Sequence, residues 1–152
     1  MPHVDVYVGL AHQAEQTLAE SYRRIADGHA AEADVFHLAH TLAKLCDAHV
    51  DRLAPVRARY GEATDGEPER LHADGLAQAR SGPVGLLRDL QDLHLLATLC
   101  DTTYAVLMQA AQGVQDRELL AIAEACRQDV SRQLGWLQTR LKTAAPQALL
   151  VG

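Results

Sequence analysis

The stretch LCDAHVDRL, residues 45–53, places a thiol and an imidazole three residues apart. Residues at this spacing lie on the same face of an α-helix, so Cys46 and His49 are expected to point in the same direction. Thiolate and imidazole together are typical ligands of zinc or copper, whereas imidazole and carboxylate favour iron or manganese. The pair therefore raises the hypothesis of a metal site inside a helical domain.

Two further cysteines and one glutamate extend this hypothesis. Cys100 and Cys126 fall on the apolar stripes of later segments, and Glu15 flanks the stripe of the first segment. At a rise of 1.5 Å per residue, the midpoints of the expected helices place these side chains within about 4 Å of one level. The candidate metal ligands are therefore Glu15, Cys46, His49, Cys100 and Cys126. Tyr104, one turn beyond Cys100, is a candidate hydrogen-bond partner.

The same residues have a second, purely structural interpretation. Free cysteine is among the most buried residue types and packs like a small hydrophobe. A histidine on an apolar seam is often satisfied by a carboxylate or a carbonyl of a neighbouring helix. The chain has three cysteines, an odd number, far apart in the sequence, so reduced thiols in a reducing compartment fit better than a disulfide framework.

Helices are the elements that must position these residues. Apolar residues recur at three- and four-residue steps in four segments, and no strand pattern competes. Aromatic residues make up only 4% of the chain, so the core is built from Leu, Ala and Val, which suits helix-on-helix packing. The predicted fold class is all-α, a four-helix bundle in a single domain over residues 1–152. The expected helices cover about residues 4–27, 32–60, 83–113 and 116–143.

Local signals mark where these helices begin and end. We predict Gly28 as the left-handed residue that closes the first helix and Gly113 as the end of the third. Pro55 predicts a kink or an early end of the second helix, and Pro146 predicts the end of the fourth. Asp116 is the expected N-cap of the fourth helix. The apolar stripe of that helix is predicted as Leu119, Ala123, Cys126, Val130, Leu134, Leu137 and Leu141.

Residues 61–82 are rich in glycine and charge and form the longest connection. At about 3.3 Å per residue, this segment can run the full length of a bundle. The first two helices and the last two have short connections and should pack antiparallel, so a long crossover makes the second and third helices parallel. Within the crossover we expect a short helix that begins at Glu67, with Leu71 and Leu76 packing onto the bundle.

The helix lengths and the central crossover resemble the ferritin-like superfamily. Its members that bind two metals typically carry a Glu on helices one and three and an E-x-x-H on helices two and four. Glu15 and His49 stand at matching positions, whereas Cys46 and Cys100 replace glutamates. The fourth helix has no histidine, and Glu124 and Asp129 are the only carboxylates near its centre. The resemblance implies the scaffold, with an altered or lost metal site.

Charge and composition narrow the classes of partner. The net charge is −6 and no block of Lys and Arg stands out, so we expect neither nucleic acid nor a membrane surface as a partner. The N-terminus lacks a basic stretch followed by an apolar run, and no apolar segment approaches the roughly 20 residues that span a bilayer. We therefore expect a cytoplasmic, unprocessed protein, and the Ala-rich outer faces favour a homodimer.

Two functions follow from these patterns, and the sequence leaves both open. One is a bundle that binds a metal, with zinc, copper and iron as candidates, or a small ligand at its midplane. The other is a non-catalytic scaffold whose long loop or ALLVG tail contacts a protein partner. The absence of a G-x-S-x-G, P-loop or dinucleotide motif argues against an enzyme. A redox enzyme with an unusual ligand set is the third and least favoured option.

Overall fold

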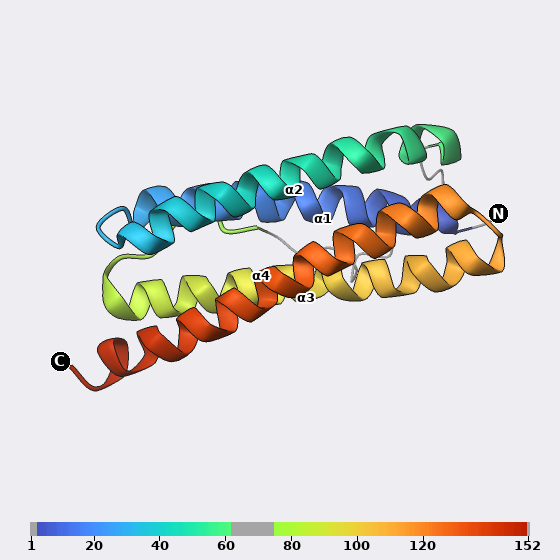
Figure 1. Ribbon diagram of the computed structural model, residues 1–152. Coiled ribbons are helices and arrows are strands. Elements are labelled where there is room, and N and C mark those ends of the chain that lie inside the picture. Colours follow the sequence, from blue (N-terminus) through green and yellow to red (C-terminus); the bar gives the residue numbers. More distant parts are fainter. Residues whose placement is uncertain (1–2, 62–74, 152) are drawn as a thin grey trace.

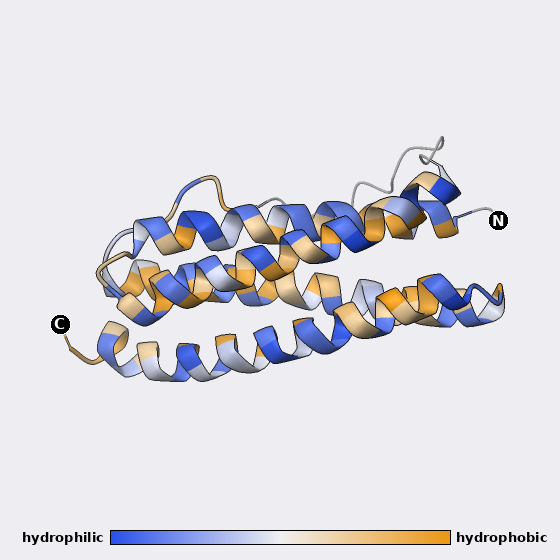
Figure 2. Cartoon of the chain, turned by 45° about the horizontal axis from the view of Figure 1, so that its top comes forward, coloured by the Kyte–Doolittle hydropathy of each residue, from blue (hydrophilic) through white to orange (hydrophobic). Residues whose placement is uncertain are grey.

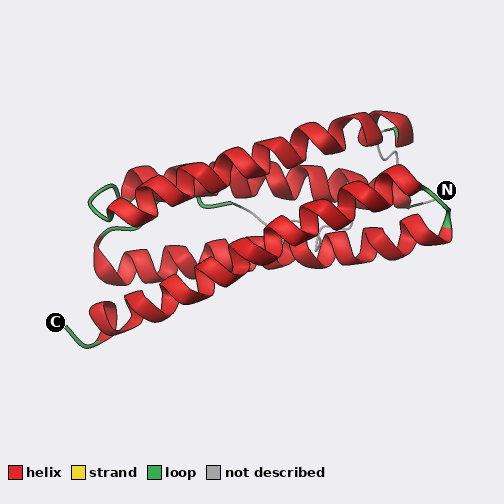
Figure 3. Cartoon of the chain, viewed as in Figure 1, coloured by secondary structure: helices red, strands yellow, loops and turns green. Residues whose placement is uncertain are grey.

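The computed structural model describes residues 3–61 and 75–151, and it folds them into four long helices (Figures 1 and 3). The helices are α1 (Val4–Gly28), α2 (Ala33–Tyr60), α3 (Gly82–Gly113) and α4 (Arg117–Leu149). No strand occurs in this part of the chain. The predicted all-α four-helix bundle is confirmed. Gly113 ends α3 as expected, and Asp116 caps α4 by accepting a hydrogen bond from the Leu119 amide at 3.0 Å.

The helices pack as two antiparallel pairs, α1 with α2 and α3 with α4 (Figure 1). The pairs join mainly through α1 and α3, and α2 and α4 touch over only a short stretch. Hydrophobic and hydrophilic residues alternate along each helix in Figure 2, as amphipathic helices require. The buried apolar side chains form one continuous cluster that includes residues of all four helices.

The connection between α2 and α3 spans the bundle from one end to the other. Helix α2 ends beside the start of α1, whereas α3 begins at the opposite end (Figure 1). The last part of the crossover lies along α1, where the Leu76 amide donates to Ser21 Oγ at 3.3 Å and Leu76 is buried. Helices α2 and α3 are therefore parallel, as predicted. The short helix expected from Glu67, with Leu71, lies outside the described residues.

A buried carboxylate anchors the end of the crossover. Asp89 on α3 is fully buried and accepts hydrogen bonds from the backbone amide and the guanidinium of Arg80, at 2.8 and 2.7 Å. His29, just after α1, places its Nε2 2.8 Å from the same carboxylate. Asp89 thus joins the end of α1, the crossover and the first turns of α3.

Gly28 does not play the predicted role. It is the last residue of α1 and has no positive φ, so the expected left-handed closure is wrong. A Cβ atom at this position would lie 2.2 Å from Ala79 Cβ. Glycine is required here because the crossover passes directly against the helix backbone.

Neither internal proline ends its helix. The predicted end of α4 at Pro146 is therefore wrong, whereas the alternative of a kink at Pro55 stays a prediction. Pro55 lies within α2, which continues to Tyr60, and the fully buried Leu53 and Val56 anchor the turns on either side of it. Pro146 lies within α4, which continues to Leu149. Its carbonyl accepts a hydrogen bond from the Leu150 amide at 2.9 Å. Both helices therefore continue past a residue that lacks a backbone donor.

None of the four helices in the described part of the chain is long and apolar enough to cross a lipid bilayer.

Candidate functional site

Glu15 on α1 is the centre of a polar layer inside the bundle. Its side chain has no solvent exposure, although it lies on the buried face of α1 between the apolar residues Ala11 and Leu18. Its Oε2 contacts His49 Nδ1 and accepts a hydrogen bond from the Tyr104 hydroxyl at 2.8 Å. Its Oε1 is also buried, and it has no hydrogen-bond partner within the described residues. Such an atom is rare in folded proteins, because burying an oxygen without a partner costs about 1–3 kcal/mol.

His49 on α2 lies between two carboxylates that come from different helices. Its ring is 1% exposed, with Nδ1 on Glu15 and Nε2 2.9 Å from Asp129 Oδ2 on α4. Burial lowers the pKa of His49, but hydrogen bonding to Glu15 and the negative charges of Glu15 and Asp129 raise it more. The net effect is a pKa above the ordinary value. The imidazolium form is therefore favoured, and it donates to both carboxylates.

The three cysteines are free thiols and are buried around the Glu15 carboxylate. Burial is the main reason that the thiol pKa values of Cys46, Cys100 and Cys126 are raised, and the charge of Glu15 raises each of them further. The pKa of Cys126 reaches about 11. The thiols are therefore protonated at neutral pH unless a cation replaces their protons.

A second set of polar contacts lies beside this layer and involves Gln133 of α4. The Tyr22 hydroxyl donates to Gln133 Oε1 at 3.0 Å, and Cys46 Sγ lies within 4.0 Å of the same side-chain amide. Gln133 is 1% exposed, whereas the predicted stripe residues Leu134 and Leu141 are only partly buried. Leu134 and Leu141 pack against the core as predicted, but the prediction missed Gln133. This glutamine can be buried because the Tyr22 hydroxyl and the Cys46 thiol supply polar partners.

The structure places the five sequence-predicted residues in the interior and brings Glu15 and His49 into direct contact. Tyr104 hydrogen-bonds within the site, as expected. Asp129 was not among the predicted ligands. It lies three residues beyond Cys126, the same spacing as Cys46 and His49, and this repeated spacing is the signal that points to it.

No three His, Cys, Asp or Glu side chains among residues 3–61 and 75–151 are arranged to surround one metal ion. The reason lies in their present hydrogen bonds, since both nitrogens of His49 face carboxylates and Cys46 lies against Gln133. The polar layer also differs from a dinuclear iron centre. Such a centre uses four carboxylates and two histidines, whereas His49 here has two carboxylates, Glu15 and Asp129, around it.

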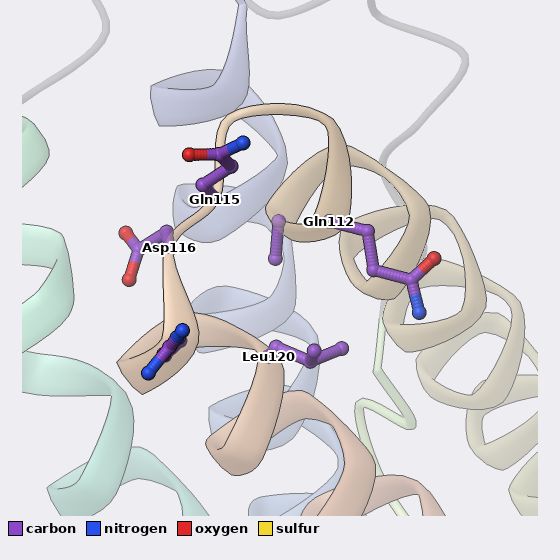
Figure 4. Close-up of a pocket in the computed structure, with 6 residues that line it drawn as sticks. Gln112, Gln115, Asp116 and Leu120 are labelled. Atoms are coloured by element: carbon purple, nitrogen blue, oxygen red, sulfur yellow. The ribbon is translucent and has the colours of Figure 1, made fainter.

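A surface pocket at the turn between α3 and α4 is separate from this layer (Figure 4). Gln112, Gln115, Asp116 and Leu120 line it, together with Ala111 and Arg117. The Asp116 carboxylate in the lining of this pocket already has hydrogen-bond partners, because it caps α4 and accepts a hydrogen bond from the Tyr60 hydroxyl at 2.6 Å. None of the five candidate metal ligands lines this pocket.

Comparison of the chain with models of protein families, with curated proteins and with solved structures gave no match. The function of this chain must therefore be inferred from its own residues.

Proposed function

We propose that this bundle binds one transition metal ion in the polar layer, through Glu15, His49 and the thiols of Cys46, Cys100 and Cys126. The observation that carries the proposal is Glu15 Oε1, a fully buried carboxylate oxygen without a hydrogen-bond partner in the described part of the chain. A cation bound to this oxygen would satisfy it. The protons on the neighbouring imidazole and thiols are those that such a cation would displace.

The types of donor favour zinc over a hard cation. Zinc accepts sulfur, nitrogen and oxygen ligands in one site, whereas magnesium and calcium require oxygen. Copper also suits thiolate and imidazole ligands. Asp129 has a supporting role in this proposal, because a metal-bound histidine usually donates its other ring N–H to a carboxylate, and Asp129 lies 2.9 Å from His49 Nε2.

The chain fits a ferritin-like scaffold whose ligand set has changed. The parallel α2 and α3, joined by a long crossover, support this part of the proposal. The single histidine in the layer favours binding, storage or sensing of a metal over oxygen chemistry at two irons. Three unpaired cysteines suit a reducing compartment such as the cytoplasm. A homodimer remains part of the proposal, on the argument from Ala-rich outer faces alone.

A structural scaffold is the second candidate, and one observation favours it. Both ring nitrogens of His49 already have carboxylate partners, and Tyr104 donates to Glu15. A network that is satisfied in this way can fix the register of the helices without a ligand.

Metal analysis of protein purified without an affinity tag separates the two candidates. The metal site predicts about one equivalent of metal per chain, and the H49Q variant loses it. H40Q is the matched control, because His40 pairs with Asp27 at 3.0 Å on the surface, away from the layer. Protein without metal, whose melting temperature does not change with added zinc, copper or iron, would favour the scaffold.

A further inference from the structure

The polar layer approaches solvent at one of its carboxylates. Glu15 is fully buried and His49 is 1% exposed, whereas the Asp129 side chain is 25% exposed. The Asp129 carboxylate touches the His49 ring, which in turn touches Glu15. These three side chains form a continuous polar path from the surface to the unpartnered oxygen of Glu15.

This path lies in the seam between α2 and α4, the two neighbouring helices that contact each other least. The other helix pairs that close the interior, α1 with α2, α3 with α4 and α1 with α3, pack extensively. A cation that enters elsewhere would have to cross closely packed apolar side chains, which is costly. The seam is therefore the route into the interior with the lowest free-energy cost for a cation.

One arginine lies against the carboxylate at the outer end of this route. Arg132, 80% exposed, places Nη1 3.4 Å from Asp129 Oδ1. A cation that approaches Asp129 must therefore compete with Arg132 for the carboxylate.

We infer that metal ions enter the layer through the α2–α4 seam, with Asp129 as the first carboxylate that they meet and Arg132 as the group that restrains it. This inference rests on the proposed metal site. A carboxylate at the mouth of a low-dielectric path raises the local concentration of cations and so speeds their uptake. A guanidinium paired with that carboxylate opposes this effect.

The test is the rate of zinc uptake by the metal-free full chain, followed by stopped-flow competition with a chromogenic zinc chelator. D129N removes the charge but keeps an oxygen that can accept the His49 Nε2–H. Because Asp129 also orients His49, the zinc affinity should fall by about 10–100-fold, so the association rate is measured separately from the affinity. Uptake should slow by about tenfold, the lower end of the effect expected for electrostatic steering. D101N is the matched control, because Asp101 is 23% exposed and pairs with Arg127 at 3.1 Å, but lies in the α3–α4 groove.

Substitution of Arg132 gives a second, independent test of the route, since its exposed side chain can be replaced without disturbing the core. R132Q should speed zinc uptake, whereas R127Q should leave it unchanged. Equal uptake rates for wild type, D129N and R132Q, with zinc still bound at one equivalent, would overturn the seam route and leave the metal site standing. Protein that takes up no zinc at all would overturn the metal site, and the route with it.

Discussion

His49 on α2 and Asp129 on α4 form a charged hydrogen bond, with Nε2 2.9 Å from Oδ2, across the least packed seam of the bundle. This contact ties the α1–α2 pair to the α3–α4 pair. The same ring contacts the buried Glu15 of α1. One imidazole thus links three helices at the level where the cysteines gather, and its charge affects both the stability of the fold and the proposed site.

Two buried tyrosines provide a direct comparison of charged and neutral hydrogen bonds. Tyr104 donates to the Glu15 carboxylate and Tyr22 donates to the Gln133 amide, and both side chains are fully buried. We expect Y104F to lower the free energy of unfolding by about 1.5–3 kcal/mol and Y22F by about 0.5–1.5 kcal/mol, since hydrogen bonds to charged groups are stronger. Urea unfolding followed by the fluorescence of Trp136, the only tryptophan, measures both values. A larger loss in Y22F than in Y104F would contradict this order.

The raised pKa of His49 makes the stability of the metal-free protein depend on pH. Burial lowers this pKa, but Glu15 and then Asp129 raise it above the value of 6.5 expected in the unfolded chain. The folded protein therefore holds the proton more tightly, and the resulting stabilisation is fully present below pH 6.5 and is lost as pH rises through the raised pKa. The melting temperature of wild type should fall over this range.

The H49Q variant isolates this contribution of His49. The thiols, whose pKa values are also raised, lower the stability at higher pH in both proteins, so the difference between wild type and H49Q is the quantity to measure. That difference should shrink as pH rises above 6.5. H40Q, which alters a surface pair, should follow wild type. A difference that is constant with pH would show that His49 is neutral in the fold.

Asp89 is predicted to be the most sensitive carboxylate at the end of the crossover. D89A leaves His29 and Arg80 without their buried partner and should cost about 3–5 kcal/mol of stability. D92A removes a 30% exposed partner of the same Arg80, 2.8 Å away, and should change stability by no more than about 0.5 kcal/mol. Chemical unfolding of the two variants gives the comparison, and equal losses would show that Asp89 does not anchor the crossover.

The same alanine substitution should have opposite effects at two glycines. G28A brings a Cβ to 2.2 Å from Ala79 and should destabilise the fold by about 1–3 kcal/mol, because the crossover must move. G135A lies within α4 with nothing within 4 Å of the added Cβ, and should stabilise by about 0.5–1 kcal/mol. Thermal unfolding measures both changes. A stabilised G28A would mean that the crossover does not press on α1.

The sequence was sufficient to predict the four helices and their connection. In α3 the buried apolar residues from Leu86 to Ala111 recur at three- and four-residue steps, which is the pattern from which the helices were predicted. The length of residues 61–82 predicted the parallel arrangement of α2 and α3, because a chain of that length reaches across a bundle. Seven of the eight helix ends lie within one residue of the prediction, and only α4 differs, because it continues to Leu149 beyond the predicted residue 143. The local conformation at the ends was predicted less well. The contacts that decide them, such as Ala79 against Gly28, come from segments far apart in the chain.

The polar layer could be predicted only in part. The helix midpoints and the rise of 1.5 Å per residue placed Glu15 and His49 near one level, and the structure brings them into contact. The partners from α4, Asp129 and Gln133, depend on how that helix is rotated about its axis. If α4 is rotated about its axis by one residue position, Gln133 replaces Leu134 on the side that faces the core. The apolar pattern of the sequence favours the leucine at that place. Only the partners across the bundle show which side of α4 is buried. Gln133 contacts Tyr22 and Cys46, and Asp129 contacts His49.

Cobalt(II) titration of the metal-free wild-type protein, followed by absorption spectroscopy, tests the central claim most directly. Cobalt replaces zinc in sites of mixed sulfur and nitrogen ligands and reports thiolate ligation by a ligand-to-metal charge-transfer band. The metal site predicts that this band grows to a sharp end point at about one equivalent per chain and disappears when zinc is added. A spectrum that remains that of free aqueous cobalt throughout the titration would contradict a metal at Glu15 and His49 and leave the layer as a structural network.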